Sequence, residues 1–147
     1  MPSFDIENIK IEDSWSSKEI AFEDSELIAF FRKNLGVADI AGHPALQYLA
    51  YLTISYVPFD PQGFPSKEDY KLISDFEEID VPNIETGSNS IHVASVLKNG
   101  IKDLLFYVTD PDAFIQVVNR NNSRIQSFDL GLEMVSDPNW EIYADLP

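Results

Sequence analysis

Cysteine is absent from this chain of 147 residues. The absence excludes a disulfide framework, a thiolate nucleophile and a thiolate metal site, and it suits a reducing compartment. Glycine is scarce, with 6 residues, and no glycine-rich phosphate-binding loop is present. The metal-binding His-Glu-x-x-His and EF-hand patterns are also missing. We therefore expect no bound metal and no cofactor, and no pattern in the sequence marks a catalytic residue.

The chain also lacks the segments that direct a protein to a membrane. Its first residues do not show the basic and apolar regions of a secretory signal. The longest strongly apolar stretch, residues 45–57, is far shorter than the roughly 20 residues that span a bilayer and carries Gln47, Thr53 and Ser55. We therefore expect a cytoplasmic protein that does not contact a membrane.

Basic side chains are few, 10 against 25 acidic ones, which gives a formal net charge of -15. Such a chain repels nucleic acid and anionic lipid, because phosphate binding depends on lysine and arginine. The charge fits two interpretations, solubility alone or a specific basic protein partner such as a nuclease or a toxin. The densest acidic run surrounds the end of a predicted helix, where it opposes the helix dipole. As a candidate partner-binding surface, this run and its extension comprise Glu68, Asp69, Asp75, Glu77, Glu78, Asp80 and Glu85.

What the sequence does contain is enough apolar material for one domain, 44% hydrophobic and 12% aromatic residues. In residues 1–45 we expect an extension. Apolar residues alternate over residues 4–12, which indicates a strand, and a helix follows that Asp24 or Ser25 caps and Gly36 ends. Residues 46–135 form the core of the domain, and residues 136–147 form a tail that is either a short strand or a packing segment.

The core region predicts the element order βαββαβ. Apolar residues alternate over residues 46–57, 90–98, 101–109 and 124–135, which indicates four strands. One helix, with its N-cap near Ser66, is expected to run to about residue 79, and a second begins at residues 110–111 with an aspartate and a proline. This order is that of a ferredoxin-like antiparallel sheet with two helices on one face. The predicted fold class is therefore α+β.

The dipeptide Asn-Gly at residues 99–100 predicts a β-hairpin with a type I′ turn. Continued regular pairing from this turn places Val93 opposite Phe106 and His92 opposite Tyr107. The sheet face away from the helices then carries Leu49, Tyr51, His92, Leu105 and Tyr107. This open sheet face is too apolar to lie in water, so either the N-terminal extension covers it or a partner does.

Several short motifs resemble those of a known protein family. They are Gly63-Phe64-Pro65, the pair Phe106-Tyr107, Asp137-Pro138-Asn139-Trp140 with Tyr143, and the final Leu146-Pro147. Residues 46–147 resemble the bacterial family catalogued as domain of unknown function 695, although the chain has Ala94-Ser95-Val96 where a glycine is expected in the strand before the hairpin. The resemblance implies a protein without established catalytic residues. It also implies an architecture similar to that of the ribonuclease E regulator B family, acidic ferredoxin-like proteins that act by binding an enzyme.

We expect a non-enzymatic, acidic protein-binding domain, an inhibitor or regulator similar in kind to immunity proteins or nuclease regulators, and a monomer or weak dimer. One alternative is a small hydrolase that uses carboxylates with His92 or His43, the 2 histidines of the chain. Both histidines also have a plainer interpretation as packing residues. A further alternative is a structural homodimer through the open sheet face.

Overall fold

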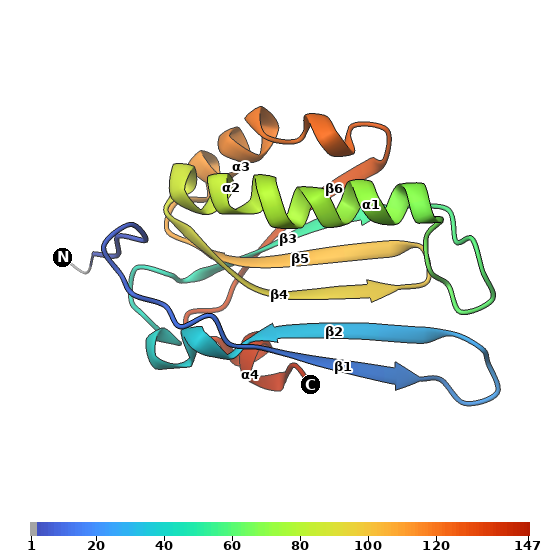
Figure 1. Cartoon of the computed structure of the whole chain (residues 1–147). Helices are drawn as coiled ribbons and strands as arrows, with labels where there is room; N and C mark the ends of the chain where they lie inside the picture. The colour runs from blue at the N-terminus through green and yellow to red at the C-terminus, as the bar shows by residue number, and fades with distance from the viewer. Residues whose placement is uncertain (1–2) are drawn as a thin grey trace.

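The computed structural model describes residues 3–147, which contain one open antiparallel sheet and four α-helices (Figure 1). The six strands lie in the order β1-β2-β4-β5-β3-β6. The elements follow one another as β1 (Trp15–Ala21), β2 (Ile28–Asn34), the 3₁₀ helix η1 (Leu35–Ile40), β3 (Tyr48–Ser55), α1 (Lys67–Asp75), the π-helix η2 (Phe76–Asp80), α2 (Val81–Ser88), β4 (Ser90–Lys98), β5 (Ile101–Val108), α3 (Pro111–Arg120), the 3₁₀ turn η3 (Ser123–Ile125), β6 (Asp129–Ser136) and α4 (Glu141–Asp145).

The predicted α+β class and the four strands of the core region are confirmed. The sheet as a whole differs from the predicted four-stranded one, because the hairpin β1–β2 joins the edge strand β4. The strand order of the complete sheet is therefore not that of a ferredoxin-like sheet. The first helix also continues past the predicted end at residue 79, since η2 connects α1 to α2 in spite of Pro82 near the start of α2.

The predicted helix between residues 24 and 36 is wrong, since these residues form the turn before β2 and the strand itself. Asp24 has a positive φ of 57°, and the Ser25 side chain accepts from Leu27 N, which closes a turn in place of a helix cap. Strand β2 then pairs with β4, for example Phe30 with Leu97. Apolar and aromatic residues in this run suit either element, and the pairing with β4 decides for the strand.

The predicted strand over residues 4–12 is also wrong. This segment is a turn followed by irregular chain, and its apolar residues pack beneath the sheet. The tail is a packing segment that contains the short helix α4, and not a strand. No helix within residues 3–147 is both long and apolar enough to cross a bilayer.

Two apolar cores lie on the two faces of the sheet. Helices α1, α2 and α3 cover the first face, as Figure 1 shows, and the side chains buried there include Leu52, Phe76, Phe106 and Phe114. The second face is covered by the chain's own ends, with Phe4 and Val37 from the N-terminal part and Trp140 and Tyr143 from the tail. Leu49, Leu105 and Tyr107 are buried there, and Tyr51 is half-buried. The face predicted to be open, and suggested for a homodimer, is therefore an internal core.

The β4–β5 hairpin follows the predicted register from the turn as far as the pair Ala94 and Leu105. A β-bulge then inserts one extra residue between His92 and Ala94, so His92 pairs with Phe106 and not with Tyr107. A bulge moves all following side chains to the opposite face. The predicted position of His92 on the open sheet face is thus wrong, because His92 lies on the face covered by the helices.

Candidate functional site

A buried group of ionisable side chains lies between the helices and the sheet. Lys102 of β5 and Arg32 of β2 both approach Glu77 of η2, with Lys102 Nζ 3.1 Å and Arg32 Nη1 3.5 Å from the same oxygen, Oε1. The side chains of Lys102 and Glu77 are 12% and 11% exposed. We call these three residues, together with His92 and Glu85, the Glu77 cluster.

Two irregularities of the backbone occur at this cluster. Glu77 belongs to the π-helix η2, a rare form that is frequent at functional sites. His92 adjoins the β-bulge of β4, and bulges often redirect a side chain. The Asn34 side chain donates to the His92 carbonyl at 3.1 Å and so holds β2 against β4 beside the bulge. The sequence patterns contain no sign of either irregularity, so the cluster could not be predicted.

The imidazole of His92 is enclosed between two aromatic rings. The ring centroids of Trp15 and Phe106 lie 5.1 Å and 4.9 Å from that of His92. Its Nε2 atom is buried without a hydrogen-bond partner among the described residues. Burial lowers the pKa of His92 to about 4, against the opposite effect of Glu77. The ring is therefore neutral at pH 7.

The two carboxylates of the cluster have opposite pKa shifts. Burial alone would raise the pKa of Glu77, but its basic neighbours, Lys102 first among them, lower it below the usual value. Burial raises the pKa of Glu85 to about 7, although its Oε2 accepts a bond of 3.0 Å from the His92 backbone N–H. Glu77 is therefore ionised at neutral pH, whereas Glu85 is partly protonated.

His92 and Glu85 line one cavity of about 230 Å³, together with Trp15 and Asn34. The hydrolase alternative requires a histidine side chain in contact with a buried carboxylate beside a cavity. His92 meets this requirement only in part, because Glu85 accepts from its backbone N–H and its Nε2 has no partner among the described residues. His43 does not meet it. Its Nδ1 accepts from Ala45 N at 3.0 Å, and its ring packs edge-on against Phe4. Within residues 3–147, no three His, Asp or Glu side chains are grouped as ligands for one metal ion.

The acidic run predicted as a partner-binding surface is divided among internal contacts. Asp75 pairs with Lys71 at 2.7 Å and Asp80 with Arg124 at 2.9 Å. Glu77 and Glu85 belong to the buried cluster. The remaining members are exposed, as Glu68 and Glu78 are, or half-buried on the first turn of α1, as Asp69 is. These residues share one helical segment but do not form one continuous exposed patch.

Basic side chains are also engaged in internal contacts. The four half-buried ones are Arg32, Lys33, Lys102 and Arg124. Lys33 Nζ donates to the Leu146 carbonyl at 3.2 Å and lies 4.7 Å from the centre of the Tyr143 ring. The other three form the ion pairs already described. Four of the 10 basic side chains are therefore held in internal contacts and only partly exposed.

An exposed acidic turn and two exposed apolar side chains lie at the same end of the sheet. Glu23, Asp24 and Glu26 are exposed in the turn between β1 and β2. The following loop touches this turn, because Ile28 N donates to the Gln62 carbonyl at 3.1 Å and Glu26 lines a shallow cavity with Pro61. On that loop Val57 is 80% and Phe59 is 75% exposed. We call Glu23, Asp24, Glu26, Val57 and Phe59 the acidic turn surface.

The motif Asp137-Pro138-Asn139-Trp140 with Tyr143 has a structural role. Trp140 stacks on Tyr107, with ring centroids 3.9 Å apart, and its Nε1 donates to the Leu46 carbonyl at 3.0 Å. The Tyr143 hydroxyl donates to the Asn34 carbonyl at 2.7 Å. The motif therefore fixes the tail over the second core.

These features define a small α+β domain with a core on each sheet face and a buried ionic cluster beneath its helices. The chain belongs to the family of unknown function DUF695, whose model matches residues 13–146. The predicted family is thus confirmed, and the match begins well before residue 46, so it includes the hairpin β1–β2. No curated protein and no solved structure matches the chain.

Proposed function

We propose that this chain is a non-enzymatic, acidic protein-binding domain that inhibits or regulates a basic protein, such as a nuclease or a toxin. The acidic turn surface carries the proposal. Val57 and Phe59 are largely exposed at the same end of the sheet as the three exposed acids, although large apolar side chains of this kind usually lie inside a domain. Aromatic residues, phenylalanine among them, are enriched in protein–protein interfaces, whose rim is polar.

The charge of the domain supports the same function. Four of the cations face inward, so an approaching basic surface meets few repelling groups. Complementary charge speeds association and suppresses wrong partners, while a buried aromatic anchor supplies most of the affinity. The matching partner surface has an apolar pocket for Phe59 with lysine or arginine around it.

We also propose that strands β4-β5-β3-β6 and the helices on their first face form a ferredoxin-like unit, to which the hairpin β1–β2 is an addition. The order of these four strands and their antiparallel pairing support this proposal. The suggested likeness to the ribonuclease E regulator B family rests on this unit and on the acidic surface.

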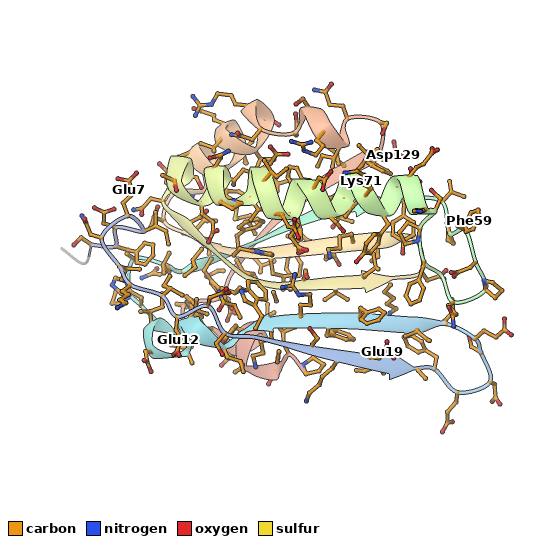
Figure 2. All side chains as sticks on the ribbon, viewed as in Figure 1. Glu7, Glu12, Glu19, Phe59, Lys71 and Asp129 are labelled. Atoms are coloured by element: carbon orange, nitrogen blue, oxygen red, sulfur yellow. The ribbon has the colours of Figure 1, made fainter. Side chains whose placement is uncertain are left out.

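A charge-reversal experiment tests the function. The variant Glu23→Lys/Glu26→Lys changes the acidic turn, and Glu7→Lys/Glu12→Lys makes the same change in net charge at the opposite end of the molecule, where Figure 2 shows both control residues far from Phe59. Each immobilised protein, with Phe59→Ser as a third variant, is exposed to extract of the organism that encodes it. Proteins retained at low and high salt are identified by mass spectrometry.

We expect the wild type and the Glu7/Glu12 control to retain the same basic protein at low salt and to release it at high salt. The turn variant and Phe59→Ser should both lose it. Equal retention by all four proteins, or retention of only acidic proteins, would show that this surface does not bind a basic partner.

The Glu77 cluster supports a second candidate, a small hydrolase in which His92 acts with Glu77 or Glu85. A general base must come within hydrogen-bonding distance of the proton that it removes. His92 Nε2 is enclosed, so this activity requires the cluster to open toward the adjoining cavity. Purified protein and the variant His92→Gln, compared on simple carboxylic and phosphate esters, decide this candidate. Activity that His92→Gln retains in full, or no activity at all, excludes His92 as the base.

A further inference from the structure

A second cavity of about 230 Å³ lies between α1 and the strands β2, β4 and β5, and it shares no lining residue with the cavity beside His92. Phe30, Phe64 and Leu97 supply apolar walls. The remaining lining side chains are Arg32, Tyr70, Ser95 and Lys102. None of its lining residues belongs to the acidic turn surface. A ligand of this cavity would therefore bind independently of the proposed protein partner.

The charge of this cavity is opposite to that of the protein. Arg32 and Lys102 both lie against one oxygen of Glu77, so two cations face a single carboxylate. His92 adds no charge at pH 7. None of the lining residues, all of which belong to the described residues 3–147, is acidic. One positive charge is therefore in excess at a half-buried position, where salt screens it less than at the open surface.

Both cations keep hydrogen-bond donors beyond those that Glu77 uses. An ammonium group has three N–H donors and a guanidinium group has five. Lys102 Nζ makes one short contact with Glu77, and the contact of Arg32 is a long one of 3.5 Å. A carboxylate placed in the cavity can thus receive charge-assisted hydrogen bonds from both residues without displacing Glu77.

The apolar walls fit the body of such a ligand. The rings of Phe30 and Phe64 lie 5.5 Å apart at an angle of 42°, and Leu97 is buried beside them. The two rings are in direct contact with each other, so a flat ligand ring packs against the wall that they form and not between them. The volume is below the range of roughly 300 to 1,000 Å³ of common ligand pockets, so the cavity admits a single ring and excludes a nucleotide.

From these contacts we infer that the cavity binds a small monocarboxylate that carries one apolar ring, with the ring against Phe30, Phe64 and Leu97 and the carboxylate at Arg32 and Lys102. An acidic protein would otherwise repel such an anion. The excess charge of Arg32 and Lys102 over Glu77 supplies the attraction, and the aromatic walls select for the ring.

Titration of the full chain with benzoate, followed by NMR of backbone amides, tests this inference. Benzamide has the same ring without the charge, and acetate has the charge without the ring. We expect benzoate to shift the amide signals of Phe64, Ser95, Leu97 and Lys102, and both analogues to bind at least about tenfold more weakly, since each loses one of two contributions of this size.

The variant Arg32→Gln removes one cation and should also weaken benzoate binding, whereas Lys71→Gln removes one exposed cation from α1 and should not. Arg32 is partly exposed, so its variant is expected to fold, and its amide spectrum verifies this. Equal binding of benzoate and benzamide, shifts that follow exposed lysines over the whole surface, or no shift at millimolar benzoate would each overturn the inference. None of these results bears on the acidic turn surface, whose variants leave the cavity intact.

Discussion

The hydroxyl group of Tyr107 donates a hydrogen bond of 2.6 Å to Asp137 Oδ2, across a sequence separation of 30 residues. Asp137 also accepts from Glu141 N and Ile142 N, each at 3.0 Å, and so caps helix α4. One buried carboxylate therefore connects a central strand to the tail of the chain. Asp137, the first residue of the segment Asp137-Pro138-Asn139-Trp140, therefore has a structural role.

Asp137→Ala should destabilise the domain by about 2 to 4 kcal/mol, because it removes a helix cap and leaves the buried Tyr107 hydroxyl without its acceptor. Urea unfolding followed by circular dichroism measures the change. Asp145→Ala, at the exposed end of the same helix, serves as the control and should leave the unfolding midpoint unchanged. Similar midpoints for both variants would mean that the tail does not contribute to the cooperative unit.

Glu77→Gln should also be strongly destabilising. The change leaves Lys102 and Arg32 half-buried without their counter-charge, and loss of one partner from a buried ion pair costs roughly 3 to 5 kcal/mol. The neighbouring Glu78→Gln makes the same chemical change at an exposed position of the same π-helix and should have little effect. If the two variants unfold at the same urea concentration, the Glu77 ion pairs do not stabilise the fold.

Glu85 predicts a dependence of stability on pH. Its folded-state pKa of about 7 is above the ordinary glutamate value of 4.5, because the side chain is buried. Below pH 4.5 Glu85 is protonated in both states, and its stabilising effect is lost as the pH rises through 7. Relative to wild type, Glu85→Gln should therefore become more stable between pH 5 and pH 8, by on the order of 2 kcal/mol. Urea unfolding of both proteins at these two pH values measures the difference.

His92 acts in the opposite direction over part of the same range. Its folded-state pKa of about 4 is below the ordinary histidine value of 6.5, so its contribution to stability is present above pH 6.5 and is lost as the pH falls through 4. Wild type alone would mix the two effects, and the comparison with Glu85→Gln cancels the contribution of His92. A stability difference between the two proteins that stays constant from pH 5 to pH 8 would contradict the raised pKa of Glu85.

The core strands and the hairpin turn could be predicted because their patterns act locally. Alternation over residues 46–57 and the Asn-Gly turn both depend on neighbours in the chain, and both appear in the structure. The segment before Gly36 could not be assigned in this way. Its apolar residues suit a helix or a strand. Pairing with β4 decides between them, and β4 lies far away in the sequence, as the pair Phe30 and Leu97 shows.

The Glu77 cluster depends on one inserted residue and one widened helical turn. Regular pairing from the Asn-Gly turn would place His92 on the second core, and the bulge places it beside Phe106 and near Glu77. Likewise, charge density alone suggested one acidic surface around residues 75–85, whereas ion pairs with Lys102 and Arg124 divide it. Composition does not predict ion pairs between residues that are distant in the sequence.

Gly63 lets the loop that carries Phe59 pack closely against the β4–β5 turn. It has a φ of +89°, and a Cβ atom built there would lie 2.9 Å from Asn99 Cα in the β4–β5 turn. Gly42 has a similar φ of +84°, but a Cβ atom there meets nothing within 4 Å.

Both Gly→Ala variants incur the cost of a left-handed backbone, roughly 1 to 2 kcal/mol. Only Gly63→Ala adds a clash, between the new Cβ atom and the backbone of Asn99. Gly63→Ala should therefore unfold at a lower urea concentration than Gly42→Ala and should shift the amide signals of Phe59 and Asn99. Equal midpoints for the two variants would show that the loop yields freely, and the acidic turn surface would then have no fixed position relative to the sheet.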